Sequence, residues 1–93
     1  MKDIDRLWSN FLETRSEEDK KKLVEYYYFF VGQIAGNVAK GMDYKIPVEE
    51  LISLGVDGLY DAIEKFNLSK KATFKTYAYI RIRGSIIDGL RRE

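Results

Sequence analysis

The chain has 93 residues, enough for one domain and too few for two. It contains neither Cys nor His, which excludes disulfides, thiol nucleophiles, zinc sites built on Cys or His, and imidazole catalysis. The longest uncharged run, residues 26–39, is too short and too polar to span a bilayer, and the N-terminus lacks the apolar stretch of a signal peptide. We therefore expect a single-domain cytoplasmic protein that is not an enzyme and needs no metal or cofactor.

The total charge of +1 conceals a gradient along the chain. Six basic and seven acidic residues give residues 1–25 a net charge of −1. Two basic and six acidic residues give residues 26–64 a net of −4, and eight basic and two acidic residues give residues 65–93 a net of +6. An acidic middle beside a basic end indicates two surfaces with different partners, although ordinary solvated faces explain such runs equally well.

Apolar residues recur at helical spacing along the whole chain, which predicts an all-α bundle of about four helices. The first helix is expected over residues 3–14. Ser16 and the three acids that follow it are typical of a helix start, because the hydroxyl can accept a backbone N–H and the acids face the positive end of the helix dipole. This second helix should run to about Lys40, with Gly41 ending it.

Pro47 suits the first turn of a third helix, which should extend to about Phe66. Gly55 and Gly58 lie inside that helix and each lowers its stability by roughly 1 kcal/mol relative to Ala. Two such glycines three residues apart indicate that another helix packs closely against them. Residues 67–72 read as a polar loop, after which Thr73 can cap a fourth helix over residues 74–91.

The fourth helix has Tyr, Ile and Arg side chains on every side. One apolar edge repeats every four residues and consists of Phe74, Ala78, Ile82 and Ile86. Tyr77, Arg81, Gly84 and Asp88 form a neighbouring edge. Basic side chains among aromatic rings suit unpaired nucleic acid, since the cations hold phosphates and the rings stack on bases. From the residues alone we expect Phe74 in the core. For Tyr77 with Arg81 and Arg83, nucleic acid contact is as open as the alternative, in which Tyr77 and Tyr79 are core residues and the arginines are solubilising.

Five consecutive aromatics occupy residues 26–30 of the second helix. They point in all directions, so some must be partly exposed, but an aromatic stripe is more often core than a binding surface. The acidic pairs Glu49/Glu50 and Asp57/Asp61 lack His partners and favour a solvated face or a basic protein partner over a metal ion.

Two long motifs carry a family resemblance. Residues 49–66 read EELISLGVDGLYDAIEKF and residues 73–91 read TFKTYAYIRIRGSIIDGLR. Together they resemble the second conserved region of bacterial RNA polymerase sigma factors, above all the flagellar (motility) class. The resemblance covers roughly Leu23 to the C-terminus and implies a non-enzymatic all-α domain that docks on core polymerase and recognises and melts the minus-ten promoter element.

In this family the third helix docks on the clamp coiled coil of the beta-prime subunit. The corresponding residues are Glu50, Ser53, Leu54, Val56, Asp57 and Tyr60. Primary sigma factors carry a more polar set there than Ser53, Leu54 and Val56. An acidic helix with exposed apolar side chains is also what a basic-rimmed groove would bind.

The resemblance assigns promoter opening and contact with the unpaired non-template strand to the loop before the fourth helix and to its first turns. The matching residues are Lys70, Lys71, Phe74, Lys75, Thr76, Tyr77 and Tyr79. It assigns recognition of the upstream part of the minus-ten element to the rest of the helix, at Arg81, Arg83, Gly84, Ser85, Ile87 and Asp88. Arg81 and Asp88 lie two turns apart on one face, where Arg could read guanine and Asp the amino group of cytosine.

Two features depart from the family pattern. Primary sigma factors have two tryptophans where this chain has Ile80 and Arg81, which reduces the aromatic wedge, and Gly89 replaces the Glu usual in the flagellar class.

Regions three and four are expected after residue 93, so we interpret the chain as the N-terminal domain of a longer protein. The resemblance also implies an anti-sigma factor as a further partner. The alternatives are a helix-turn-helix regulator that binds duplex DNA and a helical adaptor that binds protein only.

Overall fold

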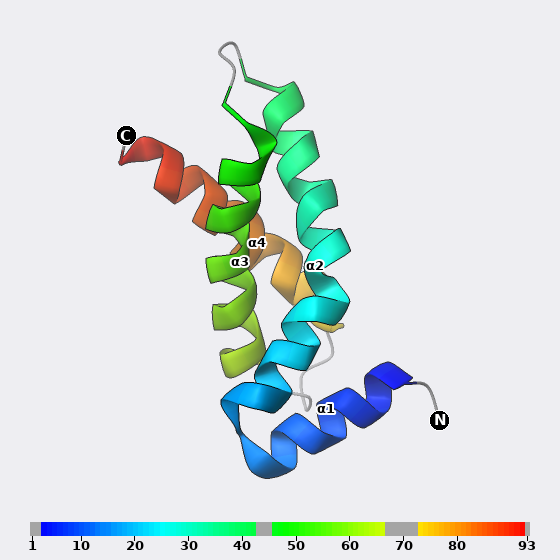
Figure 1. Ribbon diagram of the computed structural model, residues 1–93. Coiled ribbons are helices and arrows are strands. Elements are labelled where there is room, and N and C mark those ends of the chain that lie inside the picture. Colours follow the sequence, from blue (N-terminus) through cyan, green and yellow to red (C-terminus); the bar gives the residue numbers. More distant parts are fainter. Residues whose placement is uncertain (1–2, 43–45, 67–72, 93) are drawn as a thin grey trace.

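The computed structural model describes residues 3–42, 46–66 and 73–92. They form four helices, α1 (Asp3–Thr14), α2 (Glu17–Lys40), α3 (Val48–Lys65) and α4 (Phe74–Arg91), and no strand occurs among them (Figure 1). The predicted all-α fold is confirmed, and every helix boundary agrees with its prediction to within about one residue. The expected loop at residues 67–72 lies outside the described residues.

Local hydrogen bonds define the helix ends. The Ser16 hydroxyl accepts the backbone N–H of Asp19 at 3.1 Å, and the Thr73 hydroxyl accepts that of Thr76 at 3.2 Å, so both predicted caps are confirmed. Gly41 ends α2 as predicted, but with φ of −90° it does not use the left-handed conformation that favours glycine. Pro47 immediately precedes α3 instead of lying in its first turn, because the helix begins at Val48.

The two central helices, α2 and α3, run side by side in opposite directions (Figure 1). The last helix, α4, crosses them obliquely and packs most extensively against α3, while α1 lies across the N-terminal end of α2. The molecule is elongated, at 43 × 26 × 23 Å. No helix in the described ranges has a stretch long and apolar enough to cross a membrane.

The two interior glycines of α3 permit the close crossing with α4. A Cβ atom at Gly58 would lie 2.6 Å from the Arg81 carbonyl oxygen and 2.9 Å from the Ile82 Cα, distances that real side chains do not adopt. At Gly55 it would lie 2.8 Å from a methyl group of Val31 on α2. The prediction that another helix packs closely at these glycines is therefore confirmed.

Aliphatic side chains fill the centre of the bundle, and aromatic rings fill the end of the bundle that α1 covers. The buried residues of α4 are the four of the predicted apolar edge, Phe74, Ala78, Ile82 and Ile86. The Phe74 ring is only 8% exposed and lies between 4.7 and 5.2 Å, centroid to centroid, from Trp8, Tyr27 and Phe66. Within this aromatic cluster the Trp8 indole N–H donates to the Tyr27 hydroxyl at 2.9 Å, which satisfies a polar group that burial would otherwise leave unpaired.

Only part of the aromatic run in α2 belongs to the core. Tyr27 is buried and Phe30 is half-buried, but Tyr26, Tyr28 and Phe29 are exposed, Phe29 to 76%. The expectation that the run is mainly core is therefore wrong for three of its five rings. The reason is geometric, because consecutive helical positions are 100° apart and α2 is covered on only part of its circumference.

Candidate functional site

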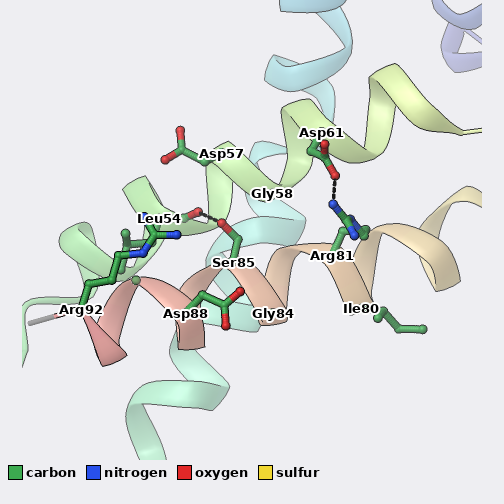
Figure 2. A pocket seen from close by; sticks show the side chains of 11 residues that line it. Leu54, Asp57, Gly58, Asp61, Ile80, Arg81, Gly84, Ser85, Asp88 and Arg92 are labelled. Carbon is green, nitrogen blue, oxygen red and sulfur yellow. Dashed lines mark hydrogen bonds and ion pairs between the residues drawn. The ribbon is translucent and has the colours of Figure 1, made fainter.

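A groove runs along the line where α3 and α4 meet (Figure 2). Its walls combine charged, hydroxyl and small residues, namely Leu54, Asp57, Gly58 and Asp61 from α3 and Ile80, Arg81, Gly84, Ser85, Asp88, Gly89 and Arg92 from α4. The groove contains two of the residues predicted to bind polymerase and four of those predicted to bind DNA. The fold thus makes the two predicted surfaces adjacent. Their separate positions in the sequence gave no indication of this.

The residues predicted to bind polymerase lie on the outer side of α3. Glu50, Ser53 and Asp57 are exposed, whereas Leu54, Val56 and Tyr60 are partly buried. Their spacing of mostly three and four residues keeps them on one side of the helix. All six are accessible to a partner, and three of them present partly covered apolar surface of the kind found in protein interfaces.

The residues predicted to bind DNA divide between the two sides of α4. Arg81, Gly84, Ser85 and Asp88 face the groove with α3. Tyr79, Arg83 and Ile87 line a second groove, between α4 and α2. Two sides of one helix are therefore available, so this set does not form a single flat surface.

The first turn of α4 contains both exposed and buried members of the predicted DNA-binding set. Lys75 and Thr76 are exposed, whereas Tyr77 is half-buried with its ring 5.9 Å from that of Phe66. Phe74 is enclosed in the aromatic cluster, in agreement with its expected core position, and a direct contact with DNA would require it to leave that cluster. Lys70 and Lys71 lie outside the described residues.

Direct contacts hold α4 against α3 within the groove. The Ser85 hydroxyl donates to the Leu54 carbonyl oxygen at 2.8 Å, a bond that joins a residue of one predicted set to a residue of the other (Figure 2). The Leu54 side chain crosses α4 at Gly89, where any Cβ would overlap it. A side chain at this glycine, which departs from the flagellar pattern, would require the end of the Leu54 side chain to move.

Asp61 lines the groove but was not among the residues predicted to bind polymerase or DNA. Its carboxylate forms an ion pair with Arg81 across the groove (Figure 2). It forms another with Lys65 at 2.9 Å along α3. The hydrogen bond from Lys65, and secondly that from Arg81, holds the pKa of Asp61 below its ordinary value. The i,i+4 spacing from Asp57 placed Asp61 on the same helix face, but it gave no sign of a partner 20 residues away.

The second groove adds polar residues of α2 that the sequence did not single out. Gln33 and Asn37 lie near Tyr79 along its edge. The Lys75 ammonium lies 5.1 Å from the centre of the Phe30 ring, within the range of a cation–π contact. Charged groups, amides and accessible rings on both sides of α4 are chemistry suited to a binding surface on this all-α domain.

Comparison with known proteins identifies the family. Residues 23–93 match the family described as sigma-70 region 2. The RNA polymerase sigma-D factor of Bacillus subtilis (strain 168) is 41% identical over 87 residues, which are 94% of this chain and 34% of that relative. RNA polymerase sigma factor FliA of Pseudomonas aeruginosa is 32% identical over 82 residues, which are 88% of this chain and 33% of that relative. RNA polymerase sigma factor FliA of Escherichia coli (strain K12) is 32% identical over 73 residues, which are 78% of this chain and 30% of that relative.

The chain belongs to the sigma-70 region 2 family, because the family match covers most of its length and includes α3 and α4 entirely. The predicted resemblance is thereby confirmed, and the relatives named sigma-D and FliA agree with the flagellar class. The chain spans about a third of the length of these curated relatives.

Proposed function

We propose that this chain is the domain of a flagellar-class sigma factor that docks on core RNA polymerase and recognises and melts the minus-ten promoter element. The observation that carries the proposal is the family match over residues 23–93, which spans both an accessible acidic α3 and a basic, aromatic α4. Its role is non-catalytic, and it acts in the cytoplasm with the polymerase. An anti-sigma factor is a further partner that the resemblance implies.

The outer side of α3 is the proposed docking surface for the clamp coiled coil of the beta-prime subunit. Acidic Glu50 and Asp57 are exposed there beside the partly covered Leu54 and Tyr60. Exposed acids steer a basic partner toward the helix, and apolar side chains at the centre of a contact supply most of its stability. Docking on this side of α3 leaves the α2 side of α4 accessible.

The proposed contact with unpaired promoter DNA uses the accessible side of α4. Tyr79 offers a ring for base stacking, which contributes about 1–3 kcal/mol per base, and Lys75 and Arg83 are exposed near it for phosphates. Arg81 and Asp88 face the other groove and are proposed to read bases of the upstream part of the element. Lys70 and Lys71 remain predicted phosphate contacts.

Charge reversal tests the docking surface. Glu50→Lys should weaken capture of core polymerase, and of the isolated beta-prime coiled coil, by about tenfold in a pull-down titration. The reason is that it places a cation opposite the basic surface expected on the polymerase partner. Glu18→Lys is the matched control, since it reverses an exposed acid in the first turn of a helix, with the same helix-dipole penalty, at a residue outside the proposed docking surface. Absence of binding by the parent chain would contradict the proposal and favour the adaptor or duplex-binding alternative.

Ring removal tests the nucleic acid contact. In the polymerase-bound complex, Tyr79→Ala should weaken binding to a single-stranded minus-ten oligonucleotide by about 5- to 150-fold, as loss of one stacking contact predicts, and leave capture of core polymerase unchanged. Tyr28→Ala is the control, because Tyr28 is an exposed ring two residues before Phe30 and so points away from α4. Equal affinities of parent and Tyr79→Ala would refute the assignment, and preference for duplex over single strand would support the helix-turn-helix alternative.

A further inference from the structure

The Asp61–Arg81 ion pair bridges the two helices that carry the proposed polymerase and DNA contacts (Figure 2). The Arg81 guanidinium is bound through Nη2 to Oδ2 of Asp61, and its side chain is still 43% exposed. An arginine has five N–H donors in a rigid plane, and within the described ranges Asp61 is the partner that the structure shows for the guanidinium, so further donors can reach a ligand. Arg81 is thus both held and accessible.

The carboxylate that holds Arg81 is itself fixed. Lys65 binds the other oxygen, Oδ1, at 2.9 Å, and the Asp61 side chain is only 29% exposed. The close approach at Gly58, three residues before Asp61, presses the backbone of Arg81 against α3. Asp61 therefore lies beside Arg81 because the helix crossing brings their two backbones close together.

We propose that Asp61 is a positioning and specificity residue, which directs the guanidinium of Arg81 for recognition of a guanine and lowers its attraction for phosphates. This inference rests on the proposed function. A guanine presents O6 and N7 side by side, and bidentate recognition requires the guanidinium plane to match them, so an arginine fixed before binding loses less entropy on forming that contact. The negative charge of Asp61 also offsets that of Arg81, which weakens sequence-independent attraction to the backbone.

These two effects distinguish a positioning role from a purely structural one. If the ion pair only stabilised the fold, its removal would weaken all DNA binding in proportion to the loss of folded protein. If Asp61 positions Arg81, its removal lowers the affinity for guanine-containing DNA and preserves or raises the affinity for other DNA. The preference for guanine then falls, which a uniform loss of folded protein cannot cause.

The test uses this chain bound to core polymerase and forked promoter probes that carry each of the four bases in turn at every upstream position of the minus-ten element. Arg81→Ala identifies the position that Arg81 reads, as the one where the base preference disappears. At that position Asp61→Asn should lower the preference for guanine about three- to tenfold, a part of the discrimination of a bidentate arginine–guanine pair. Affinity for the other three probes should stay equal or rise.

A matched control and a double variant complete the experiment. Glu64→Gln removes another carboxylate of α3, one that pairs with Lys20 of α2 at 2.6 Å, and it should leave the base preference unchanged. In the Arg81→Ala background, Asp61→Asn should have no further effect on preference, because the residue acts through Arg81.

Three results would overturn the inference. The first is an unchanged guanine preference in Asp61→Asn while Arg81→Ala abolishes it; this leaves the proposed function intact. The second is an equal loss of affinity on all four probes. The third is an Arg81→Ala variant with unaltered base preference at every position, which also removes Arg81 from the proposed function.

Discussion

The crossing of α3 and α4 at Gly58 leads to a quantitative prediction for Gly58→Ala. The new methyl group would lie 2.6 Å from the Arg81 carbonyl oxygen, 2.8 Å from the Ser85 Cβ and 2.9 Å from the Ile82 Cα. The first and last of these atoms belong to the α4 backbone, so a rotamer change cannot relieve the overlap and the two helices must move apart. Such overpacking typically destabilises a protein by about 1–3 kcal/mol, and rigid backbone neighbours favour the upper end.

The helix propensity of alanine opposes this loss. Replacing an interior glycine by alanine stabilises a helix by about 1 kcal/mol, which leaves a net destabilisation of about 2 kcal/mol. For a domain of this size each kcal/mol shifts Tm by roughly 4–8 °C, so Gly58→Ala should lower Tm by roughly 8–16 °C. Circular dichroism during thermal and urea unfolding measures both quantities.

Two further glycine variants provide the comparison. Gly32→Ala places its methyl group where no atom lies within 4 Å, so it should raise the free energy of unfolding by about 0.5–1 kcal/mol. Gly55→Ala meets only side-chain atoms, of Val31, Ile82 and Ile86, which can move, so its effect should lie between the other two. A Gly58→Ala protein as stable as Gly32→Ala would refute the close crossing of α3 and α4.

Two more predictions concern buried and paired polar groups. Tyr27→Phe removes the acceptor of the Trp8 indole N–H and should lower the free energy of unfolding by about 1–3 kcal/mol, measured by urea unfolding, whereas Tyr28→Phe at an exposed site should change it by less than about 0.5 kcal/mol. Because the pKa of Asp61 is lowered in the folded state, its stabilising contribution is present above the ordinary value of 3.8 and is lost as the pH falls through the lower folded value. Parent and Asp61→Asn should thus differ by a constant amount, at most about 1 kcal/mol, between pH 5 and 7, and the difference should shrink as the pH falls below the ordinary value of 3.8. A difference that grew on acidification would contradict this assignment.

Helix positions and ends could be predicted from local features of the chain. The hydroxyls of Ser16 and Thr73 compete for backbone N–H groups within three residues, so the caps depend on neighbours in the sequence alone. The four-residue repeat from Phe74 to Ile86 likewise identified the buried edge of α4, because helix geometry alone relates those positions. The order of motifs in α3 and α4 was sufficient to indicate the family.

Burial within the aromatic run and the pairing of Asp61 could not be predicted in the same way. Residues 26–30 have similar hydrophobicity, and their exposure depends on which sides of α2 the other helices cover. The Asp61–Arg81 pair likewise depends on the angle and depth at which α4 crosses α3, and nothing local to either residue specifies that angle. Phe74 became the centre of the aromatic cluster because three other segments converge on it.

The sequence by itself thus determined four helices, their caps, the absence of Cys and His chemistry, and the motifs of a sigma-70 region 2 domain. These properties depend on residue types and on spacings of a few positions along the chain. Only the tertiary structure decided that the acidic face of α3 and the basic face of α4 share one groove, held together by Ser85, Asp61 and the glycine contacts. The physical reason is that contacts between helices depend on how closely their backbones approach, and in this chain Gly58 allows that approach.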